Sequence, residues 1–130
     1  MRRLILLLAI LCLPPIHAEL PPSAYERMQK AATEAVDIEV LRVDIEPGKT
    51  AGSQNIHLTA LVNKTTRTAN VKEGDLIKID YTVTGHEKGW TGPGETPILE
   101  EKQKTIAYLV KDSSADSFHP AAGAMSFRNF

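Results

Sequence analysis

Three histidines follow the first eighteen residues of this chain, and they carry its clearest potential for chemistry. His57 lies in an alternating apolar segment, His86 precedes Glu87 in a glycine-rich segment, and His119 lies near the C-terminus. Histidine is a common ligand of zinc and copper. If the fold brings these segments together, His86, His119 and Met125 are candidate ligands for copper or zinc. Because their spacing matches no metal signature, surface or capping roles for the histidines are the alternative.

The only tryptophan, Trp90, lies in a long segment without regular periodicity. Residues 85–97 contain four glycines and two prolines. Long irregular loops are uncommon in small domains and are often functional, and tryptophan is enriched among binding hot spots. We therefore expect this segment to bind a protein or another ligand, with Trp90, His86, Glu87 and His119 as candidate contacts. The alternative is that Trp90 folds back and closes the mouth of a barrel.

Acid–base catalysis has three candidate residues, Asp80, Glu87 and His119, whose spacing does not differ from chance. After residue 18 the chain contains no cysteine nucleophile, no Gly-x-Ser-x-Gly motif, no phosphate-binding glycine loop and no His-Glu-x-x-His motif. These absences argue against the familiar hydrolases and nucleotide enzymes. We therefore expect a protein that is not an enzyme, and we assign no catalytic residue.

The N-terminus has the three-part order of a cleavable secretory signal. Arg2 and Arg3 precede an apolar run over residues 4–13, and Pro14-Pro15 leads to a natural cleavage position after Ala18. A buried helix is the alternative for this run. A membrane-spanning helix needs roughly 20 apolar residues, and no later segment is long enough to supply one. We expect a periplasmic or secreted protein without a transmembrane segment.

Removal of the signal changes the composition of the chain in two ways. It removes Cys12, the only cysteine, so the remaining 112 residues can form no internal disulfide. It also removes Arg2 and Arg3, which leaves 13 basic and 16 acidic residues and a formal net charge of −3. This charge offers no attractive surface for nucleic acid or for an anionic membrane. The length is sufficient for one domain with a single core.

A short helix and a long strand open the remaining chain. Ser23 and Glu26 have the spacing of a capping box, and an apolar stripe behind them predicts a helix over residues 23–34 that covers an edge of the β-structure. From residue 36 to residue 45 apolar and polar residues alternate, as in a strand. The alternation slips by one at Val40-Leu41, which indicates a β-bulge or, alternatively, a fully buried stretch.

The later segments predict a mainly β fold. Residues 56–62 and 77–83 alternate and are expected to pair as a hairpin, residues 105–110 form a fourth strand, and residues 124–127 are a candidate fifth. This order of elements is the one expected of a five-stranded oligonucleotide/oligosaccharide-binding (OB) barrel. We therefore divide the chain into a signal peptide (1–18), an N-terminal segment with the short helix (19–35) and an OB-like barrel domain (36–130).

Two short stretches carry a resemblance to a known family. Residues 71–79 read VKEGDLIKI, and residues 97–104 lead into Ile106-Ala107-Tyr108-Leu109. Over residues 36–128 the chain resembles the barrel of netrin-like modules and tissue inhibitors of metalloproteinases, which implies a netrin-like fold. Tissue inhibitors reach the protease metal through an N-terminal cysteine held by disulfides. Because no cysteine follows the signal, their inhibitory mechanism is not implied.

These observations together predict an exported, non-enzymatic binding module. It engages a protein or another envelope ligand through residues 85–97, with a second contact at residues 118–123. The alternative is a periplasmic copper-binding or zinc-binding protein that uses the loop histidines.

Overall fold

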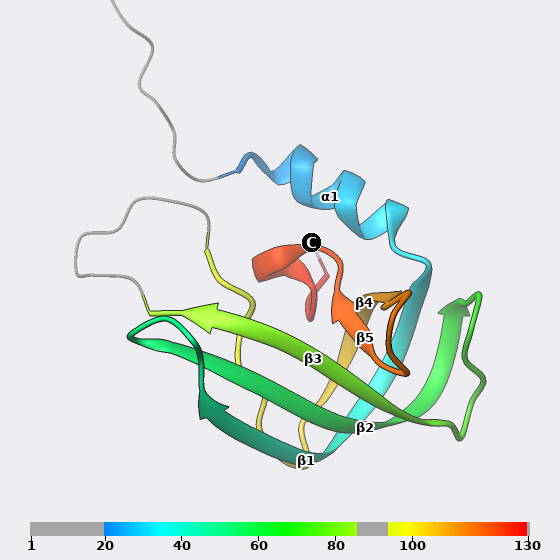
Figure 1. The fold of residues 1–130 in the computed structure, drawn as a ribbon. Helices are drawn as coiled ribbons and strands as arrows, with labels where there is room; N and C mark the ends of the chain where they lie inside the picture. Colours follow the sequence, from blue (N-terminus) through cyan, green and yellow to red (C-terminus); the bar gives the residue numbers. More distant parts are fainter. Residues whose placement is uncertain (1–19, 86–93, 130) are drawn as a thin grey trace, which may run out of the picture.

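The computed structural model describes residues 20–85 and 94–129, and in this part the chain is mainly β. Helix α1 (Pro22–Ala31) precedes five strands and the short 3₁₀ helix η1 (Gly123–Met125) (Figure 1). The strands are β1 (Glu34–Pro47), β2 (Ser53–Arg67), β3 (Leu76–Thr84), β4 (Lys104–Lys111) and β5 (Phe118–Pro120). They close into a barrel in the order β1-β2-β3-β5-β4, so the predicted five-stranded β-barrel is confirmed. No helix within the described residues has the length and apolar character needed to cross a membrane.

Strand β1 is long and bent, and it pairs with a different strand along each of its two edges. Its N-terminal half pairs antiparallel with β4, and almost its whole length pairs antiparallel with β2. The pairing with β2 jumps from Val40 to Arg42, which leaves Leu41 as the extra residue of a β-bulge. The predicted bulge is therefore confirmed.

Strands β2 and β3 form the long hairpin that the alternation predicts, with Ser53 opposite Thr84 and Leu61 opposite Leu76. Strand β2 continues to Arg67, beyond the predicted end, because Thr65 and Arg67 pair with the start of β1. The inward-facing side chains of all five strands form one apolar core. Its fully buried members include Val36, Val40, Ile56, Ala60, Ile79, Ala107 and Leu109.

The strand that closes the barrel is not the predicted one. A fifth strand at residues 124–127 is wrong, because the closing strand is β5. The chain after β5 instead turns through Gly123, with a φ of 51°, and forms η1. Residue Phe127 then returns its side chain to the barrel core, where it is only 5% exposed. The apolar character of the tail thus reflects packing of single side chains and not a strand.

Helix α1 begins without the predicted cap. Its N-cap residue is Pro21 and no side chain caps it, so the capping box of Ser23 and Glu26 is wrong. A proline at the first helical position fits this start, because its missing N–H is one that an α-helix leaves unbonded anyway. The helix ends at Ala31, three residues before the predicted end, because the chain enters β1 at Glu34.

The other end of α1 is joined to the barrel by two side chains. Arg67 at the end of β2 donates to the carbonyl oxygens of Ala32 and Gln29, in the last turn of the helix where carbonyl groups lack full intrahelical bonding. Gln29 is buried and donates from Nε2 to the carbonyl oxygens of Met125 and Arg128, at 2.8 Å each. In Figure 1 the helix accordingly lies along η1 and the C-terminal segment.

Candidate functional site

The predicted binding segment continues directly from β3. Residues 86–93, with His86, Glu87 and Trp90, lie outside the described residues. At the start of the segment, the Gly85 N–H donates to the carbonyl oxygen of Gly52 in the β1–β2 turn, at 3.2 Å. This bond fixes the point at which the chain leaves the barrel.

The far end of the same segment is also attached to the barrel. The Glu95 carboxylate accepts bonds from the Thr84 backbone N–H and hydroxyl, at 2.6 and 2.5 Å. The hydroxyl of Tyr81 on β3 donates to the Pro97 carbonyl oxygen at 2.7 Å. Both ends of residues 85–97 are therefore held against the end of β3.

A second group of polar residues lies on the outer face of β1, β2 and β3 and centres on His57. Its Nδ1 is 2.8 Å from Oδ1 of Asp80, and its Nε2 is 2.7 Å from Oε1 of Glu46. The bond to Asp80 and then the bond to Glu46 raise the pKa of His57 above its usual value. Since both ring nitrogens face carboxylates, the geometry suits the doubly protonated imidazolium.

His119, on β5, is held in a similar way and shares Asp80 with His57. Its Nδ1 is 2.8 Å from the Asp80 carbonyl oxygen, and its Nε2 is 2.8 Å from Oδ2 of Asp112. The bond to the Asp80 carbonyl is the main cause of a raised pKa for His119. The Ser114 N–H and hydroxyl, together with His119, lower the pKa of Asp112 to about 2. The two acid–base candidates Asp80 and His119 are thus in direct contact, through the backbone of Asp80.

Of the three predicted metal ligands, His86 lies outside the described residues, and His119 and Met125 belong to two different elements. Met125 belongs to η1, where its carbonyl oxygen accepts the bond from Gln29. His119 would have to give up one of its two hydrogen bonds before a ring nitrogen could bind copper or zinc. Within residues 20–85 and 94–129, no three His, Cys, Asp or Glu side chains are grouped so that they could hold a metal ion. Metal binding through His86, His119 and Met125 stays a prediction.

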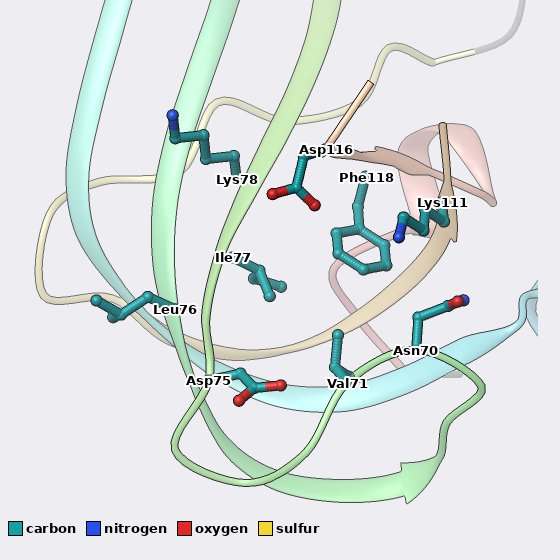
Figure 2. Close-up of a pocket in the computed structure, with 9 residues that line it drawn as sticks. All are labelled: Asn70, Val71, Asp75, Leu76, Ile77, Lys78, Lys111, Asp116 and Phe118. Atoms are coloured by element: carbon teal, nitrogen blue, oxygen red, sulfur yellow. The ribbon is translucent and has the colours of Figure 1, made fainter. Parts of the chain in front are cut away.

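A third region, not predicted from the sequence, is a pocket of about 190 Å³ at the opposite end of β3 from residues 85–97 (Figure 2). Its apolar surface comes from three nearly buried side chains, Val71, Ile77 and Phe118. Charged and polar residues surround this surface: Asn70, Asp75, Lys78, Lys111 and Asp116, with the exposed Leu76 beside them. Figure 2 shows the side chains of Leu76 and Lys78 extending away from the Phe118 ring.

The pocket residues come from two segments that are more than thirty residues apart, which is why periodicity could not reveal the pocket. One local signal was present: the apolar Phe118 directly follows the polar turn over residues 112–117, where Asp116 lies. The register explains the opening beside it, because β3 and β5 pair only at Ile79 and Phe118. On the N-terminal side of Ile79, the edge of β3 that faces β5 has no paired strand beside it in the described barrel.

Comparisons with protein-family models, with curated proteins and with solved structures find no match to this chain. The assignment of a function therefore rests on the geometry described above.

Proposed function

We propose that this chain is an exported, non-enzymatic binding module built on an OB-like, netrin-like barrel, and that it binds a protein or another envelope ligand through residues 85–97. The strand order supports the OB-like assignment. Strand β1 pairs with both β2 and β4, and β5 inserts between β3 and β4 with a parallel pairing to β3. This is the connectivity of a five-stranded Greek-key barrel, a fold used for ligand binding through its loops.

The observation that carries the binding proposal is the double attachment of residues 85–97. Gly85 is bonded to Gly52, and Glu95 and Pro97 are bonded to Thr84 and Tyr81. Loops that present binding residues are commonly placed on a rigid scaffold, because fixed ends reduce the entropy lost on binding. The attachment at both ends therefore favours binding over that of a linker held at neither end.

The state of the histidines supports a role other than catalysis. A general base needs an imidazole nitrogen that is free to accept a proton. Both nitrogens of His57 and both nitrogens of His119 instead face hydrogen-bond acceptors in the barrel. Three of these bonds connect strands, and the fourth joins β5 to the turn after β4, which is a structural role.

The test is capture of a partner from envelope extract by the purified protein, compared with the Trp90→Ala variant. We expect Trp90→Ala to abolish capture with a change in melting temperature of no more than about 2 °C, the size of a neutral surface substitution. The matched control is Leu76→Ala, which removes a side chain that is 65% exposed at the other end of β3. Equal capture by Trp90→Ala and the unsubstituted protein, or a large loss of stability, would contradict the proposal.

The same preparation also tests the metal alternative. Protein purified without an affinity tag is analysed for copper and zinc by mass spectrometry. Stoichiometric metal that is lost in His119→Ala, with no captured partner, would favour the metal-binding function. N-terminal sequencing of exported protein tests the signal, since cleavage after Ala18 gives a chain that begins with Glu19.

A further inference from the structure

We propose that the pocket of Figure 2 binds a compact zwitterion with an apolar side chain, the chemistry of a free apolar amino acid. This inference does not rest on the proposed function, because the pocket lies at the start of β3 and residues 85–97 follow its end. It concerns a second binding site on the same barrel.

The size and surface of the pocket set the kind of ligand. A volume of about 190 Å³ lies below the ~300–1,000 Å³ of pockets for drug-sized ligands, which suits a ligand as small as an amino acid. Val71, Ile77 and Phe118 line the pocket and are 5 to 6% exposed, and the exposed side chain of Leu76 lines it as well. An apolar side chain placed there would remove this surface from water.

The charges around the pocket are of both signs. Lys111 supplies an ammonium group on one side, and the carboxylates of Asp116 and Asp75 lie around the same opening (Figure 2). Among the described residues neither Lys111 nor Asp116 forms an ion pair, and Asp75 accepts a bond from the Lys72 N–H at 2.9 Å. A ligand that carries both a carboxylate and an ammonium group can pair with Lys111 and with the aspartates at once. A ligand with a single charge would leave one of these groups unpaired.

The walls of the pocket are fixed before any ligand arrives. On one side, the fully buried Glu34 carboxylate accepts bonds from the N–H groups of Ala69 and Asn70, at 2.9 and 2.6 Å, and so holds the chain that leads to Val71. On the other side, the Asp112 N–H donates to the Ser117 carbonyl oxygen at 2.9 Å, which closes the turn that carries Asp116. Sites formed in advance are the usual kind for small ligands, because little ordering is required on binding.

The experiment is a titration of the ¹⁵N-labelled full chain with L-leucine, followed by NMR. We expect saturable shifts of the Val71, Ile77 and Phe118 amide signals, with a dissociation constant in the millimolar range or below. N-acetyl-leucine lacks the ammonium group and leucinamide lacks the carboxylate, so each should bind about 5- to 10-fold more weakly, as for the loss of one hydrogen bond of ordinary strength. Glycine, which lacks the apolar side chain, should also bind more weakly.

Two variants test the assignment of the charges. Lys111→Met and Asp116→Asn change exposed side chains, so the barrel should stay folded, and each should weaken leucine binding about 5- to 10-fold. Lys104→Met, an exposed lysine at the other end of β4, is the matched control and should bind normally. The proposal is overturned if leucine gives no saturable shifts, if both derivatives bind as well as leucine, or if both pocket variants bind as the control does. None of these results bears on capture of a partner through Trp90, so either proposal can be contradicted while the other stands.

Discussion

The imidazole Nδ1 of His119 lies 2.8 Å from the backbone carbonyl oxygen of Asp80, and this bond links β5 to β3. The backbone pairing between these two strands consists of one residue pair, Ile79 with Phe118. His119 therefore strengthens the contact between β3 and β5, which has fewer paired residues than any other pair of neighbouring strands in the barrel. Because Asp112 holds the other nitrogen, the closure of the barrel depends in part on the protonation state of a side chain.

We predict that the protein becomes less stable as the pH rises from about 6 to 9. The folded state raises the pKa of His119 and His57 above the usual value of 6.5. The stabilisation is therefore complete below about pH 6.5 and is lost as the pH rises through the higher folded-state values. Each imidazole is more than 40% exposed, so the loss should be about 1 kcal/mol or less per histidine.

Thermal unfolding at a series of pH values measures this loss. The melting temperature of the unsubstituted protein should fall across this range, and that of His119→Asn should fall less, because Asn can donate to the Asp80 carbonyl at every pH. A melting temperature that is constant from pH 6 to 9 in the unsubstituted protein would show that protonation of His119 and His57 does not stabilise the barrel.

A second prediction concerns Asp112, whose pKa is lowered to about 2 by Ser114 and His119. In the Asp112→Asn variant, His119 loses the negative partner of its Nε2, so the pKa of His119 should move down toward 6.5. NMR titration of the histidine ring protons measures the pKa of His119 and the pKa of His57 separately. The pKa of His57, which has Asp80 and Glu46 as partners, should not change and serves as the internal control. Equal shifts of both histidines would indicate a general change in the fold.

The strands and the bulge could be predicted because they depend on local periodicity. Alternation within residues 36–45 is visible without any knowledge of the partner strand, and its slip at Val40-Leu41 matches the jump in the register with β2. The closing strand could not be predicted in the same way. Strand β5 has only three residues and is defined by its pairing with β3 and β4, so its sequence carries no period.

The candidate sites were harder to predict because their partners are distant in the sequence. The sequence suggested His119 and Asp80 as functional residues, but the contact runs through a carbonyl group that every residue has. Glu34 is a charged residue at the first position of β1, and exposure is the usual expectation for a charged side chain. It is fully buried because its hydrogen-bond partners, Ala69 and Asn70, come from a turn 35 and 36 residues away.

A third prediction follows from that burial. Glu34→Ala should lower the free energy of unfolding by about 3 kcal/mol, because the N–H groups of Ala69 and Asn70 would both lose their bond to a charged, buried acceptor. Glu34→Gln keeps an acceptor oxygen and should cost about half as much. Urea unfolding of the three proteins at pH 7 measures both values, and a loss below about 1 kcal/mol in Glu34→Ala would contradict this role.

The pH dependence of the same residue is opposite to that of the histidines. Burial by itself raises the pKa of Glu34, but the bonds from Thr33, Ala69 and Asn70 outweigh it, so the pKa lies below 4.5. The stabilisation is therefore present above about pH 4.5 and is lost as the pH falls through the lower folded-state value. At acid pH the difference in the free energy of unfolding between the unsubstituted protein and Glu34→Gln should become smaller, since the Gln side chain does not titrate.

The last prediction separates the attachment of residues 85–97 from the stability of the barrel. Tyr81 is half-buried, and burial raises its pKa to about 12, so its hydroxyl stays protonated and donates to the Pro97 carbonyl at any physiological pH. Tyr81→Phe removes this donor but keeps the ring, which lies 6.0 Å from the ring of Phe127. The loss of one hydrogen bond should lower the free energy of unfolding by only about 1 kcal/mol.

Binding through residues 85–97 should be affected more than stability, because the far end of the segment then loses one of the bonds that attach it to the barrel. We expect Tyr81→Phe to retain less of the partner that the unsubstituted protein captures from envelope extract, and to do so without a change in leucine binding at the distant pocket. Tyr108→Phe, which removes a hydroxyl from β4, is the matched control and should capture normally. If Tyr81→Phe captures as much partner as Tyr108→Phe does, the attachment at Pro97 does not prepare the segment for binding.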